Sequence, residues 1–182
     1  MVFLLVLALV LLSILQLFQN NFQKALFQLS FTLFSLIYLG FMWGSIIAIK
    51  QSPDGLKHLL ILITATWFCD IGAYFVGKGL GKHKLNLPVS PKKTLEGFIG
   101  GVVVSVGAAF LACYFTGLSF SWWLLILPFG TIIGDLLESV IKRAFEVKDS
   151  SKIIPGHGGI LDVFDSLIFN APLYYFFYRI LG

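Results

Sequence analysis

The chain has 182 residues, of which 58% are hydrophobic and 12% charged, and its formal net charge is +4. Soluble domains carry roughly a quarter charged residues. This composition, with a mean hydropathy of +0.91, therefore excludes an ordinary soluble domain and indicates a bilayer protein.

Six apolar segments are candidate membrane spans, because a helix needs about 20 apolar residues to cross the hydrocarbon core. In chain order they cover 2–18, 29–49, 57–77, 95–116, 120–142 and 159–180. The first has no basic residue before it and no small-residue cleavage site after it, so we expect a retained anchor rather than a signal peptide. The uncharged run from Gly97 to Gly134 is too long for one span, and we place its break at 116–121.

These segments predict an all-α integral membrane protein with about six transmembrane helices. No repeat or low-complexity linker divides the sequence, so we expect a single polytopic domain over 1–182. Within it, 1–56 would hold the N-terminal spans and 57–182 the sequence motifs described below.

Basic residues gather on one predicted side of the membrane. Alternation of the six spans places 19–28, 78–94 and 143–158 on the same side, which holds ten of the thirteen lysines and arginines. The opposite side holds Lys50, Lys57 and Arg179. Since basic loops face the cytoplasm, we expect both long polar loops there and both termini opposite.

Acidic residues are concentrated where late hydrophobic runs end and begin. Six of the nine lie between 134 and 166, namely Asp135, Glu138, Glu146, Asp149, Asp162 and Asp165. Asp70 lies late in the third candidate span, with Tyr74 and Gly77 on its helical face. An ionisable residue inside a span is costly and usually marks a site or pathway. A place in the headgroup region, or a lysine partner, is the alternative for Asp70.

Two carboxylate pairs each share a helical face, Asp135 with Glu138 and Asp162 with Asp165. Such pairs repel each other unless cations lie between them, and ligand sets made only of oxygen favour a hard cation such as Mg²⁺. A purely structural ion-pair network is the alternative, and spacing alone does not decide between the two. Its basic members would be Lys142, Arg143 and Lys148.

The stretch PVSPKKTLEGFIGG, 88–101, places two lysines just before a predicted helix start. Ser90 precedes a proline and so favours an extended backbone, while Thr94 and Glu96 open the fourth span. Lysines and exposed amides at a helix start attract phosphate. Polybasic loops also bind anionic lipid without any chemistry, and both interpretations stay open for Lys92 and Lys93.

The stretch IIPGHGG, 153–159, has three glycines around His157, which would let the backbone approach a ligand closely. A plain turn into the sixth helix is the alternative, and a lone histidine in such a loop more often forms a hydrogen bond than acts as a base. Zinc is not expected, because neither His83 nor His157 has a Cys or His partner at zinc-like spacing.

One long pattern connects these features: Ser139-x2-Lys142-Arg143-x4-Lys148-Asp149-x5-Pro155-Gly156-His157-Gly158-Gly159-x2-Asp162-x2-Asp165-Ser166. The stretches DIGAYFVGKGLGKHKL, SPKKTLEG and GDLLES precede or open it. Together, over about 67–170, they resemble the motifs of the phosphatidate cytidylyltransferases, also called CDP-diacylglycerol synthases, in the same order.

The resemblance implies an integral membrane enzyme that joins phosphatidic acid to CTP and releases pyrophosphate and CDP-diacylglycerol. It implies Mg²⁺ dependence, with Asp135 and Asp162 at the metal centre and a second monovalent or divalent cation as an open alternative. The residues it marks as catalytic are Asp135, Lys142, Arg143, Lys148, Asp149, His157, Asp162 and Asp165. Those it marks as substrate-binding are Asp70, Ser90, Lys92, Lys93, Thr94, Glu96, Ser139, Gly158 and Gly159.

The expected partners are CTP, phosphatidic acid and the lipid bilayer, with no nucleic acid and with a homodimer left open. The expected location is the bacterial inner membrane, with the polar active site at the cytoplasmic face. There, water-soluble CTP can meet a lipid whose tails stay in the bilayer.

Three departures from the family pattern matter. Val163 stands where the family has Arg between the two final aspartates, and Ser151 stands where Gly is common. Family members are also longer at the N-terminus, so the resemblance implies a shortened member, a fragment, or a sequence begun at a late methionine. Two other functions stay open: an inactive relative that binds anionic lipid, and a cation-coupled transporter that uses the intramembrane acids.

Overall fold

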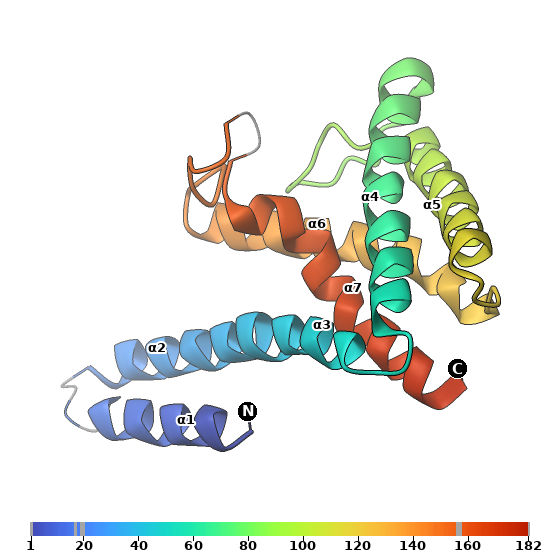
Figure 1. Cartoon of the computed structure of the whole chain (residues 1–182). Helices are drawn as coiled ribbons and strands as arrows, with labels where there is room; N and C mark the ends of the chain where they lie inside the picture. Colours follow the sequence, from blue (N-terminus) through green and yellow to red (C-terminus); the bar gives the residue numbers. More distant parts are fainter. Residues whose placement is uncertain (1, 17, 19–20, 156–157, 182) are drawn as a thin grey trace. The chain divides into compact units, whose positions relative to one another are not determined.

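Figure 1 shows the computed structural model, which describes residues 2–16, 18, 21–155 and 158–181. The chain divides into two compact units, residues 1–44 and 45–182. The described residues form helices, and their β pairing is limited to isolated bridges in two loops. The prediction of an all-α protein is confirmed.

The first unit contains α1 (Val2–Gln16) and α2 (Phe22–Ser35), followed by a π-helical segment, Leu36–Phe41, and by α3 (Met42–Lys50), whose last residues belong to the second unit. The side chain of Asn21 caps α2 by accepting a hydrogen bond from the Lys24 amide at 3.1 Å. The helix therefore begins inside the polar stretch 19–28, for which the span pattern predicts a loop.

Five helical segments are long and apolar enough to cross a membrane: Phe22–Lys50, Gly55–Leu80, Leu95–Thr116, Trp122–Ala144 and Ile160–Leu181. The described part of α1 has 15 residues. At about 1.5 Å per residue it falls short of a hydrocarbon core roughly 30 Å thick. The structure thus supports a multi-pass membrane protein. Among the described residues it has five helices of spanning length, against six candidates, because α1 is too short.

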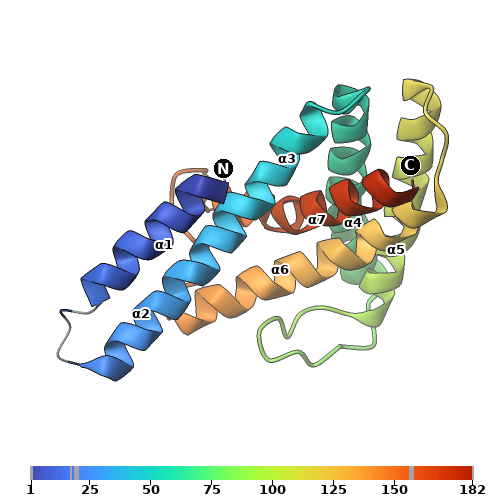
Figure 2. The same cartoon turned by 90° about the horizontal axis from the view of Figure 1, so that it is seen from below.

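The second unit is built from two helix pairs. Helices α4 (Gly55–Leu80) and α5 (Leu95–Thr116) run side by side, as do α6 (Leu127–Ala144) and α7 (Ile160–Leu181), and the pairs cross (Figures 1 and 2). A short 3₁₀ segment, Trp122–Ile126, leads into α6. Glycines let α4 and α5 approach closely, since a Cβ at Gly100 would lie 2.5 Å from the Val76 Cβ.

Helix α5 has the bounds that the sequence predicted. Thr94 caps its start by accepting a hydrogen bond from the Gly97 amide, and Gly117 ends it in the left-handed conformation at φ 72°. Both residues suit those positions, because a threonine hydroxyl satisfies a free amide and glycine tolerates positive φ. The break expected at 116–121 is confirmed, because α5 ends at Thr116 and the next helical segment begins at Trp122.

A buried amide connects three helices at the centre of this unit. Asn170 of α7 is fully buried, and its Nδ2 donates hydrogen bonds to Thr66 Oγ1 of α4 at 3.1 Å and to Thr131 Oγ1 of α6 at 2.8 Å. It also donates to the Leu127 carbonyl at 3.1 Å. Since a polar group inside a membrane helix must find partners within the protein, these bonds fix the register of α7 against both neighbours.

Candidate active site

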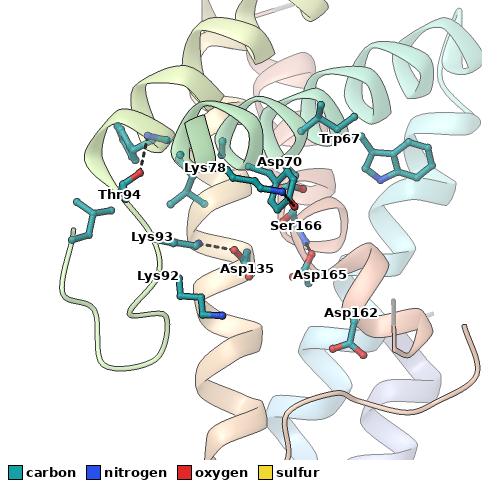
Figure 3. A pocket seen from close by; sticks show the side chains of 18 of the residues that line it. Trp67, Asp70, Lys78, Lys92, Lys93, Thr94, Asp135, Asp162, Asp165 and Ser166 are labelled. Atoms are coloured by element: carbon teal, nitrogen blue, oxygen red, sulfur yellow. Dashed lines mark hydrogen bonds and ion pairs between the residues drawn. The ribbon is translucent and has the colours of Figure 1, made fainter. Parts of the chain in front are cut away.

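A cavity of about 900 Å³ opens in the second unit, where α4, α5, α6, α7 and the loop 81–94 meet. Its polar side chains come from all of these elements except α5. They are Asp70, Tyr74 and Lys78 of α4, Lys92, Lys93 and Thr94 of the loop, Asp135 of α6, and Asp162, Asp165 and Ser166 of α7. Distant parts of the sequence thus meet at one place (Figure 3).

Three carboxylates form the acidic side of this cavity. Asp70, Asp135 and Asp165 come from three different helices and are close enough to repel one another. Asp165 is 8% exposed, and its Oδ1 accepts a hydrogen bond from the Ser166 amide. Figure 3 shows the three side chains gathered together, with Asp162 apart from them along α7. An acidic cluster in a membrane helix bundle requires positive charge nearby.

Lys93 supplies part of that charge. Its Nζ lies 2.5 Å from Asp135 Oδ2, and the two side chains are 24% and 35% exposed. Lys92 also lines the cavity, on the same side as Lys93 (Figure 3). Because both side chains are partly exposed, Lys93 could leave Asp135 to bind an anionic ligand, and Asp135 could leave Lys93 to bind a cation.

Asp162 has a different environment. Its Oδ1 pairs with Lys142 Nζ at 2.7 Å, and its Oδ2 accepts hydrogen bonds from the Ser150 amide, the Ser150 hydroxyl and the Gly159 amide. Lys142 in turn pairs with Glu138, which is fully buried. Asp162 thus holds the loop 145–159 onto α7 and also borders the cavity.

The remaining wall of the cavity is apolar. It consists of Trp67, Ile71, Ala73, Leu85, Phe98, Ile132 and Val163, with Gly77 and Gly97 between α4 and α5. Trp67 and Ile71 are 42% and 46% exposed. The cavity therefore combines charged side chains with an accessible apolar wall.

The structure brings together only part of the predicted site. Seven predicted residues line the cavity: Asp70, Lys92, Lys93, Thr94, Asp135, Asp162 and Asp165. Lys142, Gly159 and Gly158 lie just behind Asp162; Gly158 has φ 93° and exchanges backbone hydrogen bonds with Ile154.

The other predicted residues lie outside the cavity lining. Arg143 donates to the Val147 carbonyl at 3.3 Å, and Glu96 holds the loop 81–94, as described below. Lys148 and Asp149 are exposed in the loop 145–159, whereas Ser90 and Ser139 are half-buried. His157 lies outside the described residues.

The helical face shared by Asp70, Tyr74 and Gly77 does border the cavity, as their spacing predicted. Lys78, one turn beyond Tyr74 on α4, also lines the cavity and was not predicted as a site residue. Ser166 borders the cavity next to Asp165. Ser150 lies outside the cavity lining but holds Asp162 through its amide and hydroxyl. No sequence signal indicated this contact, because the two residues are twelve positions apart and meet only when the loop folds back.

The donor chemistry of the cavity suits Mg²⁺ better than any softer metal, because its ligating groups are carboxylate oxygens. Within the described residues, no three His, Cys, Asp or Glu side chains are arranged as a metal site. The two predicted ligands each pair with a lysine instead, Asp135 with Lys93 and Asp162 with Lys142. Asp135 is the more available of the two, since both oxygens of Asp162 already have partners.

Comparisons with known proteins agree with these features. A sequence model described as the cytidylyltransferase family matches residues 1–181. A protein of Staphylococcus haemolyticus named phosphatidate cytidylyltransferase is 42% identical over 170 residues, which are 90% of this chain and 64% of that protein. A protein of the same name from Staphylococcus aureus is 44% identical over 149 residues, which are 79% of this chain and 56% of that protein. The chain thus spans less than two thirds of the length of these relatives.

Proposed function

The chain belongs to the cytidylyltransferase family, and from this premise we propose that it transfers the cytidylyl group of CTP to phosphatidic acid, giving CDP-diacylglycerol and pyrophosphate. The observation that carries the proposal is the cavity itself. It places Lys93 beside Asp135, with Lys92 in the same lining, and next to an accessible apolar wall that includes Trp67 and Ile71. Such a site suits an anionic, water-soluble substrate and a lipid phosphate at the same time.

The reaction forms a bond between an oxygen of the lipid phosphate and the α-phosphorus of CTP. The bond from that phosphorus to the oxygen bridging the β-phosphate breaks, and pyrophosphate leaves with the electron pair. Both reactants are anions, so the main task of the protein is to position them and offset their charge. Lys92 and Lys93 would bind the phosphates through their ammonium groups.

Lys142 would act through Asp162, because it lies behind that carboxylate and outside the cavity lining. Its ammonium lies between Glu138 and Asp162, so its position is fixed before any ligand arrives. The apolar side chains around Val163 and Trp67 would hold the glycerol and acyl part of the lipid and keep water from the reacting phosphate.

We propose Mg²⁺ as the cofactor, with Asp135 and Asp162 as its ligands and with Asp70 and Asp165 as further oxygen donors nearby. When bound, the ion would neutralise phosphate charge and orient the two substrates. The loops 81–94 and 145–159, which are rich in basic residues, would face the cytoplasm of a bacterial inner membrane. A homodimer stays a prediction.

The test is the purified 182-residue chain in detergent with phosphatidic acid and radiolabelled CTP, with and without Mg²⁺. We expect labelled CDP-diacylglycerol only when all three are present. Asp135→Asn should lower turnover on the order of 100-fold, as for loss of one group that stabilises a charged transition state. Glu146→Gln is the matched control, because Glu146 is exposed and lies outside the cavity lining.

Wild-type protein that binds phosphatidic acid vesicles but yields no product would identify an inactive lipid-binding relative instead. Cation flux into liposomes without CTP would support the transporter alternative.

A further inference from the structure

The loop 81–94 brings the cavity lysines to their place, although it has little regular structure of its own. Its β pairing is limited to the bridges Lys84–Thr94 and Leu87–Ser90. Loops of such length are mobile unless specific contacts fix them. The position of Lys93 beside Asp135 therefore depends on what holds the loop.

Glu96, in the first turn of α5, makes those contacts. Its Oε1 lies 2.6 Å from His83 Nδ1, and its Oε2 accepts hydrogen bonds from the Lys82 amide at 3.1 Å and the His83 amide at 3.2 Å. The Glu96 side chain is only 24% exposed, and Glu96 is absent from the cavity lining. Its carboxylate is thus occupied by the loop and does not face the cavity.

Backbone hydrogen bonds connect the Glu96 contact with Lys93. The Leu95 amide donates to the His83 carbonyl at 2.8 Å, and the Leu85 amide donates to the Lys93 carbonyl at 2.9 Å. The two ends of the loop therefore lie against each other, with Glu96 joining them at the base. Lys93 then extends from the paired segment to Asp135.

We propose that Glu96 is a positioning residue: together with His83 it fixes the loop 81–94 so that Lys93 stays at Asp135 and both cavity lysines meet the anionic substrate. This differs from the substrate-binding role that the motif implied for Glu96. The kinetic consequence rests on the proposed function, whereas the structural consequence does not.

Two measurements on the whole chain test the structural part in Glu96→Gln and wild type. Hydrogen exchange should become faster at the amides of Lys82, His83 and Leu85, while exchange along the middle of α5 stays unchanged. Trace acetylation of lysines should label Lys93 several-fold faster, with exposed Lys82 and Lys84 as internal references. Unchanged exchange and labelling would overturn the proposal.

The kinetic part separates positioning from direct substrate contact. In Glu96→Gln we expect KM for CTP to rise on the order of tenfold, as for loss of a group that orients a ligand-binding residue, with a smaller change in kcat. His83→Gln should produce the same direction of change, and the double variant should be less than additive. Glu146→Gln, the same change at an exposed glutamate, should leave all readouts unchanged.

A higher KM without faster exchange or labelling would mean that Glu96 contacts substrate directly. Faster exchange and labelling with unchanged KM would mean that Glu96 fixes the loop but that this does not position the lysines for the substrate. Either result overturns the proposal. If wild-type protein turns over no CTP, the proposed function fails, and the exchange and labelling results still decide whether Glu96 fixes the loop.

Discussion

Lys93 and Asp135 form an ion pair that only the folded chain reveals, and each residue can be tested by itself. Lys93→Met removes the ammonium but keeps much of the apolar stem, so we expect kcat/KM for CTP to fall on the order of 100-fold. Both side chains are partly exposed, so loss of the pair should cost no more than about 1 kcal/mol of stability. Lys84→Met, in the same loop but outside the cavity lining, is the control. Equal losses in both variants would show that loop charge, not the position of Lys93, matters.

Val163 lines the cavity between two acidic residues of α7, at the position where the family pattern has Arg. Val163→Arg would place a guanidinium near Asp162 and the substrate phosphates, where it could bind phosphate in a bidentate manner. We expect kcat/KM to rise about tenfold, which corresponds to about 1.4 kcal/mol of transition-state stabilisation. Val163→Gln controls for side-chain size in the same turnover assay. No gain with Arg would show that Val163 is not what limits activity.

At the scale of helices, the close contact of α4 and α5 makes a specific prediction. A Cβ at Gly100 would lie 2.5 Å from the Val76 Cβ, whereas a Cβ at Gly107 of the same helix would meet nothing within 4 Å. Gly100→Ala should therefore destabilise the protein by about 1–3 kcal/mol through overpacking. Gly107→Ala should be neutral or stabilising by up to about 1 kcal/mol. Thermal unfolding in detergent measures both, and equal melting temperatures would contradict this packing.

The helices were also the part of the fold that the sequence predicted best, because a membrane span is recognised from a long apolar run alone. Helix α5 matches its expected bounds, since Thr94 and Gly117 mark its ends by local chemistry. The bond network of Asn170 and the attachment of Glu96 to the loop 81–94 could not be predicted. Both depend on which helices become neighbours. The same reason applies to the site. The motifs identified most of the charged residues, and the ion-pair network weighed as an alternative included Lys142, which does pair with Glu138 and Asp162. The pairing of Lys93 with Asp135 had no such signal.

For the molecule as a whole, the distribution of basic residues predicts which side each loop faces. The loops 81–94 and 145–159 should share the cytoplasmic side, and the turn 117–121 should face the other. Lys84, Lys152 and Ser119 are exposed, one in each segment, and the native Cys69 and Cys113 are buried, so cysteine labelling can report each loop separately.

A membrane-impermeant maleimide should label Lys84→Cys and Lys152→Cys only in inside-out vesicles, and Ser119→Cys only in right-side-out vesicles. The parent chain should stay unlabelled in both, because its two thiols lie inside the helix bundle. Labelling of positions 84 and 152 from opposite sides would contradict the number of spans between them. If positions 84 and 152 were labelled only in right-side-out vesicles and position 119 only in inside-out vesicles, the number of spans would hold. The cavity, and with it the proposed CTP site, would then face away from the cytoplasm.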